Sequence, residues 1–354
     1  MTPELGIVEG FFGRPWSWAA RAEAVAFLAP HGYLFYLYAP KADAYLRRRW
    51  QEPHPEDELA RLLAFRETCR AHGVRFGIGL TPFELQLHAE RDWQDRMAAK
   101  LAALAPLKPD DLAILFDDMK GDVPDLAERQ AAIVHFAAER SGASRILTCP
   151  SYYSDDPILD VAFGQRPAFY LEQLGRRLDP AIAIMWTGEE VCAREFTPGH
   201  LARVAEALQR KPFLWDNYPV NDGARMSQHL HLRAFTGRPA SIAPLITGHG
   251  VNPASQPVLS RIPLLTLAES YRAGESYEYG AAFDRAARAV LGEAFAERVR
   301  RDLLALQDRG LDRLGERRKA LAERYAAFAH PAAREILAWL DGHWAVTDEL
   351  VQTQ

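Results

Sequence analysis

The stretch that decides the fold covers residues 112–118 and reads Leu112-Ala113-Ile114-Leu115-Phe116-Asp117-Asp118. Its apolar part lies between the turn-rich segments 109–111 and 119–122, which is typical of a strand buried on both faces in a parallel sheet. In a barrel of parallel strands, the chemistry takes place at the carboxyl ends of the strands. The carboxylates that follow this strand are therefore the first candidates for an acid and a base.

Further short apolar runs occur in the first 250 residues, and segments with helical periodicity separate most of them. Together with residues 112–116, the predicted strands are 5–8, 33–38, 76–80, 146–149, 182–186, 213–215 and 242–246. Eight strand-helix units fit a (β/α)8 barrel, which typically takes about 250 residues. An open dinucleotide-binding sheet would have fewer strands and a Gly-rich phosphate turn, and the sequence has no such motif. We therefore predict an α/β fold, a (β/α)8 TIM barrel.

The character of the sequence changes after about Tyr271. The chain becomes rich in Ala, Arg, Leu and Glu, with apolar residues such as Phe283, Ala287 and Leu291 at helical spacing. This pattern predicts three or four helices, so we divide the chain into a barrel domain, 1–272, and a C-terminal helical domain, 273–354. Amphipathic helices usually pack for stability, which favours a cover on one side of the barrel. A homodimer surface or an outer wall of a substrate groove is the alternative.

Composition excludes several classes of function. The chain has 354 residues, 48% of them hydrophobic, and its net charge of -5 provides no basic surface for nucleic acid. Its first residues lack the features of a signal peptide, and no apolar run reaches the ~20 residues that span a membrane. Three scattered cysteines, Cys69, Cys149 and Cys192, are too few for a disulfide framework or a zinc site. The sequence predicts a cytoplasmic protein with no membrane or nucleic-acid partner and no metal or other cofactor.

Polar and aromatic residues follow most of the predicted strands. Because the carboxyl ends of barrel strands converge on one face, these residues should be neighbours in space. A pyranose needs Asp, Asn and Lys partners for its hydroxyls, and its apolar face stacks on Trp or Tyr. Phosphate would instead need Arg clusters or a Gly-rich helix start. This face of the barrel therefore predicts a carbohydrate site, lined by segments 9–16, 39–41, 117–118, 150–153, 186–188, 215–222 and 252–253.

The pair Asp117-Asp118 has two interpretations on residue chemistry alone. Two close carboxylates resist being ionised together, so one of them can stay protonated as a general acid. An exposed turn or a helix N-cap accounts for adjacent aspartates equally well. At this level the two interpretations stay open.

Ordered motifs across residues 6 to about 253 separate the two interpretations. They read Glu9-Gly10-Phe11-Phe12-Gly13-Arg14-Pro15-Trp16, Tyr38-Ala39-Pro40-Lys41, Leu115-Phe116-Asp117-Asp118, Cys149-Pro150-Ser151-Tyr152-Tyr153, Trp186-Thr187-Gly188, Trp215-Asp216-Asn217 with Asn221-Asp222, and Asn252-Pro253. In order and spacing, the chain resembles the catalytic domain of family 84 glycoside hydrolases, the O-GlcNAcases and related β-N-acetylglucosaminidases. Phe12 departs from the family, which usually has Tyr there.

The resemblance implies a retaining exo-β-N-acetylglucosaminidase that uses no enzyme nucleophile. The 2-acetamido oxygen of the substrate attacks C1 and forms an oxazoline, releasing a terminal β-linked GlcNAc from a glycoprotein (O-GlcNAc) or a glycan. Asp117 would hydrogen-bond the acetamido N–H and stabilise the developing charge. Asp118 would protonate the glycosidic oxygen and then act as a base on water.

The resemblance also implies residues that bind the sugar. Tyr153 and Cys149 would contact the acetamido group, and Trp215 would form an apolar wall. Asn217 would hold the site near the acid. The remaining partners of the hydroxyls would be Asp222 and Asn252 at the 4- and 6-positions, with the Gly10 carbonyl and Lys41 at the 3-position.

Two other classes stay open. A metal-dependent barrel hydrolase would draw its ligands from His229, His231 and His249, although such enzymes carry a His pair after an early strand and this chain does not. A non-catalytic GlcNAc-binding barrel would bind the sugar without turnover, and the presence of both carboxylates disfavours it. If the enzyme used its own nucleophile, Asp216 or Asp222 would be the candidate.

Overall fold

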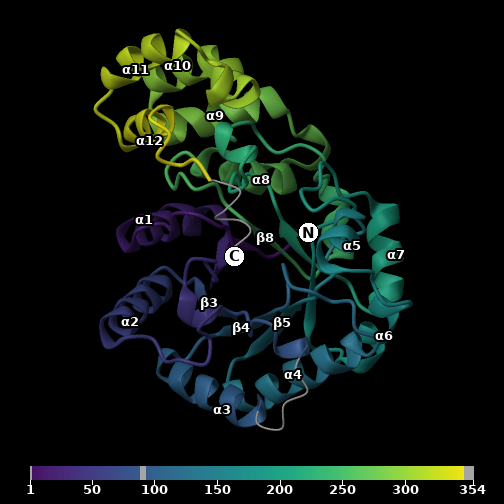
Figure 1. Cartoon of the computed structure of the whole chain (residues 1–354). Helices are drawn as coiled ribbons and strands as arrows, with labels where there is room; N and C mark the ends of the chain where they lie inside the picture. The colour runs from purple at the N-terminus through teal and green to yellow at the C-terminus, as the bar shows by residue number, and fades with distance from the viewer. Residues whose placement is uncertain (1, 88–92, 347–354) are drawn as a thin grey trace.

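The computed structural model describes residues 2–87 and 93–346, and within them a closed barrel of parallel strands runs in sequence order from β1 to β8 (Figure 1). The barrel closes where β1 pairs with β8, with Leu5 opposite His249. The predicted (β/α)8 barrel is confirmed. The strands are β1 (Leu5–Glu9), β2 (Tyr33–Tyr38), β3 (Arg75–Leu80), β4 (Asp111–Leu115), β5 (Arg145–Cys149), β6 (Ala183–Trp186), β7 (Phe213–Asp216) and β8 (Gly248–Val251).

Helices surround the strands, and further helices gather on one side of the barrel beyond α8 (Figure 1). The surrounding helices are α1 (Trp18–Leu28), α2 (Glu56–Ala71), α3 (Trp93–Leu104), α4 (Leu126–Ser141), α5 (Ile158–Phe163), α6 (Tyr170–Arg177), α7 (Pro198–Leu208) and α8 (Arg261–Ala273). The C-terminal helices are α9 (Tyr279–Leu291), α10 (Glu293–Leu303), α11 (Arg317–Ala326) and α12 (Pro331–Leu340). No helix in the described ranges is long and apolar enough to cross a membrane.

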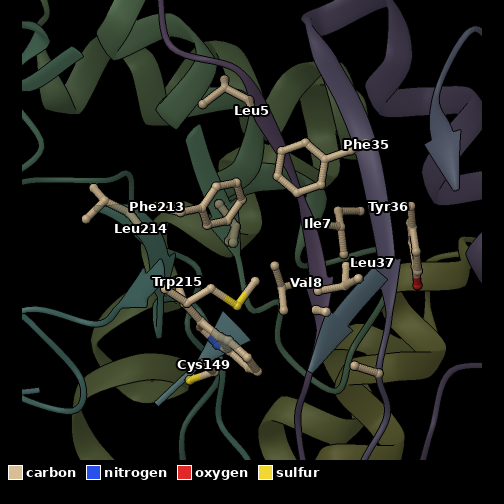
Figure 2. Close-up of a cluster of buried hydrophobic side chains, with 14 of the residues drawn as sticks. Leu5, Ile7, Val8, Phe35, Tyr36, Leu37, Cys149, Phe213, Leu214 and Trp215 are labelled. Atoms are coloured by element: carbon tan, nitrogen blue, oxygen red, sulfur yellow. The ribbon is translucent and has the colours of Figure 1, made fainter. Parts of the chain in front are cut away.

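Large side chains fill the barrel because small residues on neighbouring strands leave room for them. A Cβ atom added at Gly6 would lie 2.4 Å from the Phe35 ring, well inside van der Waals contact. Phe35 in turn meets Phe213 at 5.5 Å between ring centroids, and both rings point into the same cluster (Figure 2). Trp215 belongs to this cluster, so the barrel core continues up to the strand ends where polar residues begin.

The predicted eighth strand, residues 242–246, is wrong. Residues 242–245 belong to a 3-10 helix, η6 (Ala240–Leu245), and Ile246 follows its end, whereas the strand is the next segment, β8. Pro244 lies inside η6 and has no backbone N–H for a sheet ladder, so this apolar run is a poor central strand. In β8, Gly250 leaves space for the side chain of Val8 on β1, since an added Cβ would lie 2.4 Å from that side chain. Close strand packing therefore selected a glycine-rich segment that carries little hydrophobic signal.

The C-terminal helical region is confirmed, and it is bonded to the barrel. Glu335 on α12 is buried and accepts hydrogen bonds from the backbone N–H groups of Val258 and Leu259, both at 2.9 Å. The Trp339 indole on the same helix donates to the carbonyl of Ser227 at 3.2 Å. These helices thus hold the segments that follow β7 and β8. The boundary between residues 272 and 273 stays a prediction.

Candidate active site

A pocket lies where the carboxyl ends of the strands meet. All the catalytic and sugar-binding residues that the family resemblance implies contribute to its lining, whereas Asp216 and the three histidines of the alternatives do not. Other lining residues were not predicted from the sequence. Phe12 and Thr187 lie in the ordered motifs but had no predicted role, whereas Val191, Cys192 and Val220 are loop residues without distinctive chemistry. The lining residues are Gly10, Phe12, Lys41, Asp117, Asp118, Cys149, Tyr153, Thr187, Val191, Cys192, Trp215, Asn217, Val220, Asp222 and Asn252.

Asp117 is a buried carboxylate with one oxygen paired and one oxygen open. Its Oδ2 forms an ion pair with the Lys41 ammonium, which is also buried. Its Oδ1 is buried and accepts no hydrogen bond from any residue that the structure describes. An unsatisfied buried acceptor costs about 1–3 kcal/mol, so a ligand N–H or O–H that reached Oδ1 would recover that free energy.

The surroundings of Asp118 favour its neutral form. Its backbone has φ 57°, a left-handed conformation that turns the chain sharply just after β4. This turn lets two adjacent residues face one cavity, whereas successive residues of a continued strand would point to opposite faces. The Tyr153 hydroxyl donates to its Oδ1 at 2.9 Å. Burial raises the pKa of Asp118, and the neighbouring negative charge of Asp117 raises it further, so the neutral acid is favoured.

The polar side chains on the far side of the cavity hold one another in place. Asn252 accepts a hydrogen bond from the Gly10 N–H at 3.2 Å and donates to the Asn217 side chain at 3.0 Å. Asn217 in turn donates to the Val191 carbonyl at 2.9 Å. Asp222 accepts from the backbone N–H of Phe12 at 2.7 Å. A network of this kind fixes the side chains before a ligand arrives.

Trp215 forms one wall of the cavity and explains the glycine at position 10. A Cβ added at Gly10 would lie 2.3 Å from the Trp215 ring, so any larger residue there would displace the indole. The Lys41 ammonium lies 5.7 Å from the centroid of the same ring. The indole therefore presents a fixed apolar surface between the backbone of the first motif and the cation beside Asp117.

Asp216, one of the two candidate nucleophiles that the sequence left open, is not placed to attack a sugar. Its side chain is fully buried and does not line the cavity. It pairs with Arg238 at 2.7 Å and with His249 at 3.0 Å. Burial by itself raises the pKa of Asp216, but the Arg238 and His249 partners outweigh it and lower the pKa to about 2. Asp216 is thus a permanent anion that anchors the strand ends.

The histidines of the metal-hydrolase alternative have separate partners. His229 bonds the Gln307 carbonyl at 2.7 Å, and His231 bonds the Val220 carbonyl at 2.9 Å. His249 lies in β8 beside Asp216 and bonds the Tyr271 hydroxyl at 2.8 Å. Within residues 2–87 and 93–346, no group of three or more His, Cys, Asp or Glu side chains is arranged to hold a metal ion.

Comparison with known proteins identifies the family. Residues 5–307 match the family model described as beta-N-acetylglucosaminidase. The chain is 27% identical over 276 residues to the Protein O-GlcNAcase of Rattus norvegicus and to that of Mus musculus, and each alignment covers 75% of this chain and 30% of the relative. The chain thus spans less than a third of the length of these curated relatives.

A solved structure leads to the same family. The structure of a Thermobaculum terrenum O-GlcNAc hydrolase mutant aligns with a TM-score of 0.79 and 28% identity, covering 98% of this chain and 82% of that one. This alignment includes the C-terminal helices as well as the barrel. Since the family model also matches most of the sequence, the chain belongs to the beta-N-acetylglucosaminidase family, as its ordered motifs predicted.

Proposed function

We propose that this protein is a retaining exo-β-N-acetylglucosaminidase that works by substrate-assisted catalysis and removes a terminal β-linked GlcNAc. The observation that carries the proposal is the arrangement of the adjacent carboxyls, one paired with Lys41 and left with an open buried oxygen, the other bonded by Tyr153 with its pKa raised by burial. A hydrolase with its own nucleophile would need a second free carboxylate across the sugar. Asp216, one candidate for it, is locked to Arg238 and His249.

Asp117 is proposed to direct the nucleophile. Its open Oδ1 accepts the acetamido N–H, which turns the acetamido oxygen toward C1. Lys41 occupies the other oxygen, Oδ2, through an ion pair and so leaves Oδ1 for the substrate. As the oxygen attacks C1, positive charge develops on the forming oxazoline ring, and the fixed negative charge of Asp117 stabilises it without reorganisation.

Asp118 is proposed to move the protons. In its neutral form it protonates the glycosidic oxygen as the C1–O bond breaks, so the aglycone leaves as an alcohol. The resulting carboxylate then takes a proton from the water that opens the oxazoline at C1. Tyr153 holds the carboxyl in one orientation for both steps by donating to Oδ1. Attack by the acetamide and then by water inverts C1 twice, which gives net retention.

The substrate is proposed to be GlcNAc on a protein or a glycan. A pocket lined by Trp215 on one side and by carboxyl and amide side chains on others suits a terminal sugar. The rodent relatives are Protein O-GlcNAcases, which supports O-GlcNAc protein as one substrate class. The cytoplasmic location and the homodimer through the C-terminal helices stay predictions.

The direct test is hydrolysis of 4-nitrophenyl β-N-acetylglucosaminide followed by NMR. The β-anomer of GlcNAc should form first. A thiazoline analogue of GlcNAc should have an inhibition constant about 10²-fold or more below KM, because it mimics the oxazoline. First formation of the α-anomer, or inhibition no better than that of GlcNAc itself, would contradict the mechanism. Binding without turnover would favour the non-catalytic barrel, and loss of activity with a chelator would favour the metal-dependent class.

Substrate binding is expected to weaken in acid because of Asp222. Burial raises the pKa of this carboxyl to about 6. The ionised form, which accepts sugar hydroxyls, therefore dominates only above about pH 6. We expect KM for 4-nitrophenyl β-N-acetylglucosaminide to rise as the pH falls through 6. The Asp222→Asn variant should have a higher KM that does not change as the pH passes through 6. If the rise of KM near pH 6 persists in this variant, another group is titrating.

A further inference from the structure

Five small or apolar lining residues come from the ends of β5, β6 and β7 and from the loop after β6, and we call them the apolar lobe. They are Cys149, Thr187, Val191, Cys192 and Trp215. The acetyl group supplies the one methyl of GlcNAc, and the Thr187 N–H of the lobe donates at 2.9 Å to the carbonyl of Tyr153, a proposed acetamido partner. If the proposed function holds, this lobe receives the N-acyl group of the substrate.

The outer side of the lobe is a thin wall made of residues 191–194. Cys192 of this wall and the adjacent Asn217 line the sugar cavity, and both also line a second cavity of about 970 Å³. Space on both sides means that packing alone does not fix the position of the wall. Its amino-terminal end is tied at Val191, whose carbonyl accepts from Asn217 and whose N–H donates to Asp156 at 3.2 Å.

The carboxyl-terminal end of the wall is held by Arg238. This side chain is 6% exposed, and all five of its N–H groups are used. It donates to the carbonyls of two wall residues, Ala193 at 2.7 Å and Arg194. It also donates to the carbonyl of Thr236, two residues earlier in the sequence, at 2.9 Å. Its remaining donors form a two-point pair with Asp216, at 2.8 and 2.7 Å. The guanidinium thus fastens the wall to the end of β7.

We propose that Arg238 is a positioning residue that sets the size of N-acyl group the enzyme accepts. It touches no reacting atom, and it acts by keeping the wall from moving toward the second cavity. A five-donor group is needed because five contacts to separate acceptor atoms hold it, and a lysine offers three donors from a single point. With the wall released, the lobe can lengthen by a methylene or two and lose its selectivity for acetyl.

The test compares Arg238→Lys with Arg233→Lys. Arg233 also lines the second cavity, but it pairs with Asp308 and not with the wall. The substrates are 4-nitrophenyl β-glucosaminides with N-acetyl and N-butanoyl groups. We expect the butanoyl-to-acetyl ratio of kcat/KM to rise about tenfold in Arg238→Lys, within the range that a methylene is worth in a tight pocket, and to stay unchanged in Arg233→Lys. Because both substrates are measured on one preparation, the ratio does not depend on the folded fraction.

A second readout needs no turnover. Cys192 is half-buried in the wall, whereas Cys69 and Cys149 are buried, so alkylation by iodoacetamide can be followed by mass spectrometry at each thiol. We expect Cys192 to react several-fold faster in Arg238→Lys than in Arg233→Lys, with Cys69 unchanged as an internal measure of folding.

A variant that fills the second cavity from an exposed position, Thr236→Leu, should instead lower the butanoyl-to-acetyl ratio of kcat/KM.

The outcomes separate the clamp from the proposed function. Equal losses on both substrates in Arg238→Lys, with an unchanged Cys192 rate, would overturn the positioning role and leave a structural one. If Cys69 of Arg238→Lys stays unreactive and Cys192 is alkylated at the wild-type rate, the positioning role of Arg238 is overturned. This outcome holds even if the wild-type protein hydrolyses neither glucosaminide. Absence of wild-type turnover with a faster Cys192 reaction would reject the proposed function and retain the clamp.

Discussion

Asp118→Asn is expected to lower kcat/KM on an O-GlcNAc peptide by about 10²–10⁴-fold, the usual contribution of a general acid. A peptide serine is a poor leaving group and needs the proton that Asp118 supplies. The loss on 4-nitrophenyl β-N-acetylglucosaminide should be much smaller, because 4-nitrophenolate leaves without full protonation. Steady-state kinetics on the two substrates measure this difference directly.

The pH profile provides an independent check on Asp118. Because the pKa of this carboxyl is raised by burial and by Asp117, the neutral form is present below the raised pKa and disappears above it. Peptide hydrolysis by the wild-type protein should therefore decline as the pH rises through that pKa, and Asp118→Asn should lack the decline. Asp122→Asn is the matched control, since Asp122 is exposed just after the same strand. Equal loss on both substrates would argue that Asp118 is not the acid.

Asp117→Asn is expected to lower kcat/KM by about 10²–10³-fold on good and poor leaving groups alike, comparable with the loss of one preorganised electrostatic contact in other enzymes. The amide can still accept the acetamido N–H, but it removes the negative charge that stabilises the oxazoline. It also leaves the buried Lys41 ammonium without its ion-pair partner. Both effects act on formation of the C1–oxygen bond and are independent of the aglycone.

Thiazoline inhibition distinguishes this role from that of Asp118. The inhibition constant should rise together with the loss of kcat/KM in Asp117→Asn, because the analogue and the transition state share the contact. It should change little in Asp118→Asn. A leaving-group-dependent loss in Asp117→Asn would mean that the two carboxyls have the opposite roles. Thermal unfolding of both variants alongside Asp122→Asn measures any contribution from stability.

Local patterns in the sequence were sufficient for most of the fold. Seven of the eight strands appear as apolar runs because they are buried on both faces, and the order of strand and helix then dictates a barrel. The eighth strand escaped because its selection depends on its neighbours. Gly250 was needed where Val8 comes close, and Pro244 diverted the more apolar run into a 3-10 helix.

The candidate residues could be named from sequence because each directly follows a strand, and the ends of barrel strands meet in space. Their chemical states could not be named in this way. The open oxygen of Asp117, the anionic state of Asp216 and the neutral form of Asp118 depend on partners that lie up to 76 residues away, such as Lys41 for Asp117. Val191 and Cys192 carried no signal, since a small apolar residue in a loop has no distinctive chemistry.

The sequence by itself determined the barrel, the family and the identity of the carboxyl pair, because periodicity and ordered motifs are properties of the chain. Only the tertiary structure decided the surroundings of each carboxyl, and it also brought Arg238 to the carbonyls of Ala193 and Arg194. The physical reason is that pKa values and positional freedom are set by burial and by neighbours in space. Arg238 is 22 residues from Asp216 and 44 from Arg194 along the chain, and packing brings all three together.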